Sequence, residues 1–311
     1  MIVTLTPNPS VDRTVFVDAL PHGAVVRSTD SWSEPSGKGV NVALALNTHG
    51  VATAAVLPLG GPVGAQLTQM LRAARLPFHA VPVAGDIRSN ISIVEPDGTV
   101  TKINEAGPEL TTAEVAHLVS TALEHATTAR WLAGCGSLPA GVPVEFYATL
   151  VQEGRRRGVL VAVDTSGHPL HAVLDAGPDV IKPNVDELAE ATGTELRTFD
   201  DVVSATQKLR VRGVRSVLAS LGPDGALLVD SSGVLHGEAP AVPIVSTVGA
   251  GDALLAGFLA AGGSGRDALA RGLRWAAAAV QHRGTLFGGS DDAVPVTITA
   301  DPPLDRRLRA G

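Results

Sequence analysis

The stretch Thr247-Val248-Gly249-Ala250-Gly251-Asp252, which runs on into Ala253-Leu254-Leu255-Ala256-Gly257-Phe258-Leu259-Ala260, predicts a glycine-rich turn that opens an apolar helix. Small residues at positions 249, 250 and 251 leave the backbone N–H groups bare at the positive end of a helix dipole, which suits an anion. Asp252 lies at the same corner. A carboxylate there makes chemical sense if it accepts a proton from an attacking hydroxyl while the turn holds a phosphoryl group. The structural alternative is an N-capping aspartate after a glycine turn, and this stretch alone favours neither.

Composition narrows the class of protein. The chain has 311 residues, of which 45% are hydrophobic and 18% charged, as in a globular protein. Its net charge of −7 argues against a nucleic-acid surface. The single cysteine, Cys135, excludes an intrachain disulfide, and the nine histidines show no metal-ligand spacing. Because the longest apolar run, Ala253–Ala261, is too short to span a bilayer and the N-terminus has no signal-like basic segment, we expect a cytoplasmic protein without a membrane partner.

Strands and helices alternate along most of the chain, which predicts an α/β protein with a mostly parallel sheet covered by helices. The alternation breaks where three predicted strands follow one another without a helix: His79–Val83, Asn90–Glu95 and Thr99–Asn104. With extended pieces near 14–17 and 31–34, they predict a small separate sheet. We interpret it as a lid inserted in two pieces, approximately 13–35 and 79–106, into one domain that covers 1–311. The tail from Asp301 is predicted to be frayed surface.

Polar residues follow the predicted strands at their carboxyl ends, where ligands bind in open α/β sheets. They are Asp12, Ser137, Asp164, Lys182-Pro183-Asn184 and Gly222.

A second glycine turn, Gly37-Lys38-Gly39-Val40-Asn41, is predicted to open a helix. Its glycines let a substrate approach the backbone, Asn41 can bond sugar hydroxyls and Lys38 can meet a phosphate. The alternative is an ordinary loop and cap. The turn is not a Walker A loop, and no dinucleotide-binding glycine pattern lies between the first strand and the first helix.

Arg88 and Lys102 fall on neighbouring strands of the predicted lid, and Arg27 lies in a stretch next to it. Cations that converge from a lid are what a phosphorylated sugar needs. Solvated lysines and arginines at a sheet edge are the alternative.

Asn184 and Glu187 lie three residues apart at a predicted helix start, on one face. The pair could form a capping box, or it could hold Mg²⁺, directly or through water, against nucleotide phosphates. Ser220-Leu221-Gly222-Pro223-Asp224-Gly225 is a strand end and turn, which as a plain hairpin would have no further role.

Taken in order, these motifs resemble the ribokinase-like (PfkB) carbohydrate kinase family over nearly the whole chain. The matching stretches are Gly37–Asn41 with Gly50 and Leu59-Gly60, Gly136–Pro139, Asp164–Gly167, Lys182–Asn184 with Glu187, Ser220–Gly222 and Ser246–Asp252. The resemblance is closest to the branch of 1-phosphofructokinase and tagatose-6-phosphate kinase, because of Thr6–Asp12, Arg88–Asn90 and Gly107–Leu110. It implies a ribokinase-like three-layer α/β/α fold with a β-sheet lid.

The resemblance also implies roles for single residues. Asp252 would be the catalytic base, and the amides of Gly249, Ala250 and Gly251 would form the anion hole. The substrate would contact Asp12, Gly37, Lys38, Gly39, Asn41, Arg88, Asn90, Lys102, Ser137 and Arg27. The nucleotide would contact Lys182, Asn184, Ser220, Gly222, Gly225, Thr247, Gly249, Gly251 and Gln281. Asn184 and Glu187 would serve Mg²⁺ through water. The adenine would lie near Ala277, Gln281 and Gly284.

The activity implied is ATP-dependent phosphorylation of a ketohexose phosphate, with Mg²⁺, a candidate monovalent cation and a homodimer formed through the lid. Fructose 1-phosphate is the favoured substrate, and tagatose 6-phosphate or fructose 6-phosphate is the alternative. Lys38 departs from the minor 6-phosphofructokinase branch, which has glycine there. A kinase of an unphosphorylated sugar would not need Arg88 and Lys102 together, and a non-catalytic sugar-phosphate sensor would not need Asp252.

Overall fold

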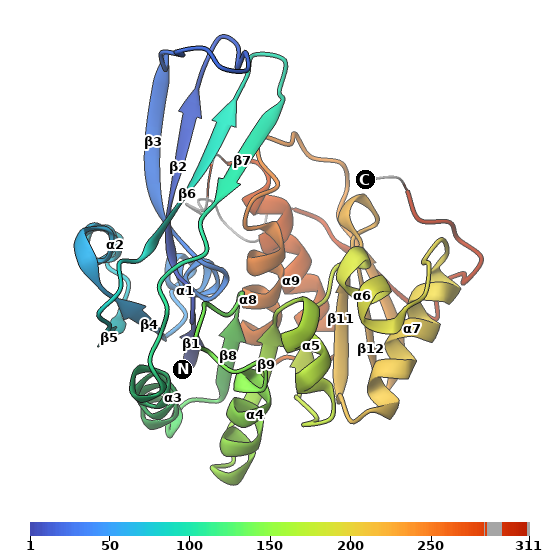
Figure 1. Cartoon of the computed structure of the whole chain (residues 1–311). Helices are drawn as coiled ribbons and strands as arrows, with labels where there is room; N and C mark the ends of the chain where they lie inside the picture. The colour runs from blue at the N-terminus through green and yellow to red at the C-terminus, as the bar shows by residue number, and fades with distance from the viewer. Residues whose placement is uncertain (283, 285–293, 310–311) are drawn as a thin grey trace.

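The computed structural model describes residues 1–282, 284 and 294–309, which form a large sheet between two layers of helices and a small sheet projecting from it (Figure 1). In the described residues, the large sheet has ten strands in the order β14-β13-β12-β11-β10-β9-β8-β1-β4-β5. Their bounds are β1 Ile2–Leu5, β4 Thr53–Leu59, β5 Phe78–Pro82, β8 Trp131–Cys135, β9 Leu160–Asp164, β10 Val180–Ile181, β11 Ser216–Ser220, β12 Ala226–Asp230, β13 Gly233–Glu238 and β14 Thr297–Ala300. Strands from β5 to β11 pair in parallel, whereas β11, β12, β13 and β14 pair antiparallel.

Helices cover both faces of this sheet, as its central strands require because they are buried on both sides. The helices are α1 Lys38–Thr48, α2 Gly61–Ala73, α3 Thr112–Ala126, α4 Phe146–Arg156, α5 Gly167–Leu174, α6 Val185–Thr192, α7 Phe199–Val211, α8 Ala250–Ala260 and α9 Gly265–Ala279, with a 3₁₀ turn η1 at Gly222–Asp224. One apolar core lies under α1, α2, α8 and α9, and a second lies under α3 to α7. None of the described helices is long and apolar enough to cross a membrane.

The small sheet has the order β3-β2-β6-β7 in the described residues. Its strands are β2 Ser10–Phe16, β3 Asp30–Ser36, β6 Arg88–Val94 and β7 Val100–Asn104. The expectation that residues 79–83 belong to it is wrong, because β5 pairs in parallel with β4 at the edge of the large sheet. The reason is that β4, α2 and β5 form an ordinary strand–helix–strand crossover, which returns the chain to the same sheet.

The expectation of a frayed tail is also wrong. β14, which was not predicted, pairs with β13, and the segment 301–309 then runs along the start of α7. The backbone N–H of Phe199 donates to the carbonyl of Arg306 at 2.9 Å, and the N–H of Leu308 donates to that of Arg197 at 2.9 Å. Backbone hydrogen bonds across a long sequence separation therefore hold this segment, and a polar, proline-containing composition does not reveal them.

Candidate active site

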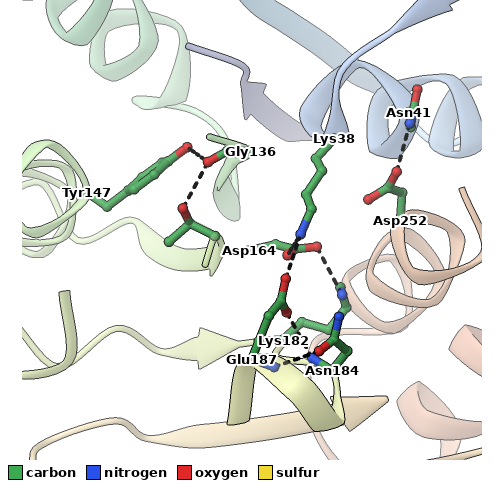
Figure 2. Close-up of polar contacts among 10 residues, drawn as sticks. Lys38, Asn41, Gly136, Tyr147, Asp164, Lys182, Asn184, Glu187 and Asp252 are labelled. Carbon is green, nitrogen blue, oxygen red and sulfur yellow. Dashed lines mark hydrogen bonds and ion pairs between the residues drawn. The ribbon is translucent and has the colours of Figure 1, made fainter. Parts of the chain in front are cut away.

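Asp252 lies in the first turn of α8 and is buried, with 7% of its surface exposed. The helix begins at Gly249, an N-cap residue with a left-handed φ of 78° that makes no side-chain cap. The interpretation of Asp252 as the cap is therefore wrong. Its Oδ2 instead accepts a hydrogen bond of 2.8 Å from Nδ2 of Asn41, which comes from the start of α1 (Figure 2). The two glycine turns thus bring their polar residues together from opposite ends of the chain.

The pKa of the Asp252 carboxyl lies close to neutral pH. Burial raises its pKa to about 6, and the negative charge of Asp164 adds to this effect. The ammonium of Lys38 and the hydrogen bond from Asn41 act in the opposite direction because they favour the charged form. A carboxylate with this pKa is mostly ionised above neutral pH and can still accept a proton.

Asp164, at the end of β9, is the centre of an ion-pair cluster next to Asp252 (Figure 2). Its side chain is fully buried; Nζ of Lys38 lies 2.7 Å from Oδ1 and Nζ of Lys182 lies 3.1 Å from Oδ2. Burial alone would raise the pKa of Asp164, but the two ammonium groups outweigh it and lower the pKa. The cluster therefore stays charged, as buried charges do when they are paired.

Lys38 also lies 3.4 Å from Oε1 of Glu187. Burial works against its charged form, but Asp164 and Glu187 outweigh burial and raise the pKa of Lys38. We expected its ammonium to meet a substrate phosphate, whereas in this structure it lies between two carboxylates.

Asn184 and Glu187 form a complete capping box at the start of α6. The backbone N–H of Glu187 donates to Oδ1 of Asn184 at 2.8 Å, and the N–H of Asn184 donates to Oε2 of Glu187 at 2.9 Å. Within the part of the chain that the structure describes, no group of three or more His, Cys, Asp or Glu side chains could hold a metal ion. These donors therefore suit a Mg²⁺ ion bound mainly by phosphates and water, not an all-protein cage.

The predicted anion hole lies beside Lys182. A Cβ atom added at Gly251 would be 3.2 Å from Nζ of Lys182, so the backbone of α8 approaches this ammonium closely. The α8 N-terminus and a buried cation thus converge, and both favour a negative charge.

A polar cavity of about 250 Å³ lies beside this cluster. Its lining residues are Asn8, Lys38, Arg88, Asn90, Asn104, Gly136, Ser137, Thr165, Ser166 and Glu187. The buried Oδ1 atoms of Asn8, Asn41 and Asn90 have no hydrogen-bond partner among the described residues. Because buried acceptors are normally paired, these atoms indicate a ligand that brings donors, such as the hydroxyls of a sugar.

Asp12 is held beside the cavity by three hydrogen bonds. Ser10 Oγ donates to it at 2.7 Å, Ser36 Oγ at 2.8 Å and Asn90 Nδ2 at 2.9 Å. The base of the small sheet therefore fixes this carboxylate, with donors from three of its strands, as preorganised binding requires.

The three predicted phosphate-binding cations differ in how closely they approach the cavity. Arg88 reaches the cavity, with Nη2 donating to the carbonyl of Asn8 at 3.0 Å and a buried Nε that has no partner among the described residues. Lys102 is exposed two residues along β7 from Asn104, so it lies on the same face of the sheet. Arg27 is exposed in the loop between β2 and β3, at the end of the small sheet farthest from the large one (Figure 1), and the structure does not bring it to this site.

The predicted nucleotide-binding residues lie along the neighbouring strand ends. Ser220 ends β11 and forms an isolated bridge with Asn184. Gly222, at φ 58°, has open space where a side chain would begin, whereas at Gly225, φ 78°, a Cβ would collide with the Gly237 carbonyl. The backbone of the turn therefore requires a glycine at position 225.

The remaining predicted nucleotide contacts lie on the α8 and α9 side of the site. Thr247 is exposed just before α8. Gln281, after α9, donates from Nε2 to the carbonyl of Ala277 at 2.9 Å, and Ala277 is itself buried. Gly284 lies against Glu34 of β3, so this part of the predicted adenine region contacts the small sheet.

Sequence reasoning missed Asn8 and the role of Asp164. Asn8 donates from Nδ2 to the Ala106 carbonyl at 3.0 Å and to Ser137 Oγ at 3.4 Å. The position of Asp164 after a buried strand indicates a ligand-binding residue, but the sequence does not reveal its ion pairs with Lys38 and Lys182. Two neighbouring segments hold the residue before Ser137: Tyr147 Oη of α4 and Thr165 Oγ1, just after β9, donate to the carbonyl of Gly136 at 2.7 and 2.9 Å (Figure 2).

Comparison with known proteins defines the class of this protein. The family model of the pfkB family carbohydrate kinases matches residues 6–292, and the chain belongs to this family. The 1-phosphofructokinase of Haloferax volcanii is 41% identical over 298 residues, which cover 94% of this chain and 95% of that protein. The 1-phosphofructokinase of Bacillus subtilis is 33% identical, over 84% of this chain and 85% of that protein.

Solved structures agree with this assignment. The crystal structure of phosphofructokinase-2 from Escherichia coli in complex with potassium superposes with a TM-score of 0.86 and 34% identity, covering 92% of this chain and 94% of that one. Ribokinase from Arabidopsis thaliana, with a TM-score of 0.75 and 22% identity, shares the fold over 92% of this chain and 94% of its own. The predicted family and the ribokinase-like three-layer fold are confirmed.

Proposed function

We propose that this protein transfers a phosphoryl group from ATP to a hydroxyl of a ketohexose phosphate, with fructose 1-phosphate as its preferred substrate and fructose 1,6-bisphosphate as the product. The observation that carries the proposal is the buried carboxylate of Asp252 at the N-terminus of α8, held by Asn41. The base and the anion-binding amides lie on the same helix turn, as phosphoryl transfer to a hydroxyl requires.

In the proposed reaction, Asp252 accepts the proton of the substrate hydroxyl as its oxygen attacks the γ-phosphorus. In a loose transition state the bond to the attacking oxygen forms late, so a base with a pKa of about 6 is strong enough. The amides of Gly249, Ala250 and Gly251, together with Lys182, stabilise charge on the transferred group. Glu187 and Asn184 would contact, through water, a Mg²⁺ ion that accompanies ATP, and that ion would compensate the charge of the phosphates.

The polar cavity supports a sugar phosphate as acceptor. Asp12, Asn90 and Asn41 offer acceptors for sugar hydroxyls, and Arg88 offers its guanidinium to the phosphate that the substrate already carries. Relatives of 33–41% identity named 1-phosphofructokinase favour fructose 1-phosphate. An ATP-dependent 6-phosphofructokinase isozyme from Escherichia coli at 34% identity keeps fructose 6-phosphate as the alternative, with tagatose 6-phosphate beside it.

An ADP-release assay with Mg-ATP tests the proposal by comparing kcat/KM for fructose 1-phosphate, fructose 6-phosphate, tagatose 6-phosphate and free fructose. We expect a preference of about tenfold or more for fructose 1-phosphate, which corresponds to about 1.4 kcal/mol in the transition state. A preference for a 6-phosphate would move the transfer to the 1-hydroxyl. A preference for free fructose would refute the phosphate-binding role of Arg88 and Lys102.

The small sheet also supports a homodimer. Asn90 and Asn104 pair across β6 and β7 and face the cavity, so Ile91 and Ile103, which pair next to them, lie on the opposite face. Ile103 is 51% exposed, and a second copy that packed its own small sheet there would cover it. Light scattering on Ile103→Lys tests this: we expect a monomer, and a monomeric wild type would refute it.

A monovalent cation stays a prediction for this chain. An Escherichia coli relative was solved in complex with potassium, which supports it. Turnover compared in potassium and in tetramethylammonium chloride at equal ionic strength checks it, and equal rates would contradict it.

A further inference from the structure

Asp224 is a buried carboxylate that the proposed reaction does not use. It lies in the turn η1, its side chain is fully buried, and it is held by the segment 301–309. Oδ1 accepts a hydrogen bond of 2.9 Å from Nη2 of Arg306, and Oδ2 accepts one of 2.6 Å from the backbone N–H of Arg309. Nε of Arg309 lies 3.2 Å from Oδ1. A buried charge with this many donors is fixed in one geometry, because moving it would leave it unpaired.

Arg306 joins two separate parts of the fold. The same Nη2 atom donates to Oε2 of Glu238 at 2.8 Å, and the guanidinium stacks on the ring of Phe199 at 4.9 Å. The carbonyl of Asp224 is in turn 2.8 Å from Nε2 of His236, a buried neighbour of Glu238 on β13. One side chain therefore ties the turn after β11 to the end of β13.

Both of these segments lead into the predicted nucleotide site. The turn Gly222–Asp224 follows Ser220, which bridges to Asn184, and Gly222 opens onto free space. β12 runs antiparallel to both β11 and β13, so Glu238 at the end of β13 lies at the same end of the strands as Ser220. The segment that follows Glu238 leads to Gly249.

We propose that Arg306 is a positioning residue for the nucleotide: by bridging Asp224 and Glu238 it holds the turn at Gly222 and the approach to the anion hole in the arrangement that binds ATP. The inference rests on the nucleotide binding that is part of the proposed kinase function. In this proposal Arg306 acts through Asp224 and Glu238, to which it donates hydrogen bonds. Loss of the Arg306 side chain would lower the fraction of molecules in the arrangement that binds ATP. The apparent nucleotide affinity would fall in proportion to this fraction.

The test compares Arg306→Gln with Arg307→Gln, a matched variant that removes the same charge from an exposed side chain one residue away. The readouts are the dissociation constant of Mg-ADP by calorimetry and the KM values of ATP and the sugar phosphate. For Arg306→Gln we expect a rise of about threefold to tenfold in the Mg-ADP constant and in the KM of ATP, with the sugar KM unchanged. Arg307→Gln should match the wild type, and Arg306→Lys should recover part of the loss.

Wild-type nucleotide binding in Arg306→Gln would overturn the inference, even if its melting temperature fell, because a merely structural contact would lower stability alone. A parallel rise in both KM values would also overturn it. If Arg306→Gln does not fold, Asp224→Asn carries the same prediction. A wild-type protein that bound Mg-ADP but phosphorylated no sugar would overturn the proposed function and leave the positioning role standing, whereas a wild type without nucleotide binding would remove both.

Discussion

Replacing Asn41 with leucine should move the acid limb of the pH–rate profile to higher pH. Asn41 donates a hydrogen bond of 2.8 Å to the carboxylate of Asp252 and so favours its charged form. When the donor is lost, the pKa of Asp252 rises. If Asp252 is the base, the enzyme then needs a higher pH to ionise it and to reach full rate.

The size of this shift follows from the hydrogen bond. In the wild type a pKa of about 6 places the midpoint of the acid limb near that value. A hydrogen bond to a charged group is worth about 1.5–3 kcal/mol, and 1.36 kcal/mol corresponds to one pKa unit. Because leucine leaves the buried carboxylate without this donor, we expect the acid limb to shift by about one to two units.

The assay is kcat/KM, measured by ADP release from pH 5 to pH 9 at substrate concentrations below KM, because this constant reports the ionisation of the free enzyme. Phosphate groups of the substrates also titrate near pH 6, but their contribution is the same for every variant. Asn47→Leu is the matched control, because Asn47 lies on the same helix and donates to the carbonyl of Ala74 instead. An acid limb that stayed in place in Asn41→Leu, or one that moved equally in Asn47→Leu, would refute the assignment of Asp252 as the titrating base.

Three further variants test other parts of the site. Arg88→Gln should raise the sugar-phosphate KM about tenfold or more and leave the ATP KM unchanged, because a charge-assisted contact is lost on one substrate only; equal changes in both KM values would contradict this. Gly251→Ala should lower kcat about tenfold, because the new Cβ would lie 3.2 Å from Nζ of Lys182 and displace that ammonium. An unchanged kcat would show that the close approach of Lys182 to the α8 backbone does not matter for turnover. Tyr147→Phe should lower the free energy of unfolding by about 1 kcal/mol in urea titrations, since the Gly136 carbonyl loses one of two donors, and no loss would mean that Thr165 satisfies it alone.

The two glycine turns could be predicted from the sequence because their signals are local. Glycines at helix starts, followed by Asn41 and Asp252, identify anion-binding backbone and a candidate base without tertiary information. The alternation of strands and helices likewise predicted the parallel sheet.

The partners of charged residues could not be predicted, since they come from distant parts of the chain. Lys38 and Asp164 are 126 residues apart, and no local pattern indicates that they pair. For the same reason the sequence indicates neither the carboxylate partners of Lys38 nor the role of Asp224 beyond its turn. The placement of β5 depended on which strand it pairs with, which its own alternation does not determine.

The most direct test of the account is the turnover of Asp252→Asn, measured together with its affinity for Mg-ATP. Asparagine keeps the size of the side chain but accepts no proton at this site. We expect kcat to fall about a thousandfold while the Mg-ATP dissociation constant stays within about threefold of the wild type. Turnover close to that of the wild type, with nucleotide binding intact, would contradict the assignment of Asp252 as the base and, with it, the proposed mechanism.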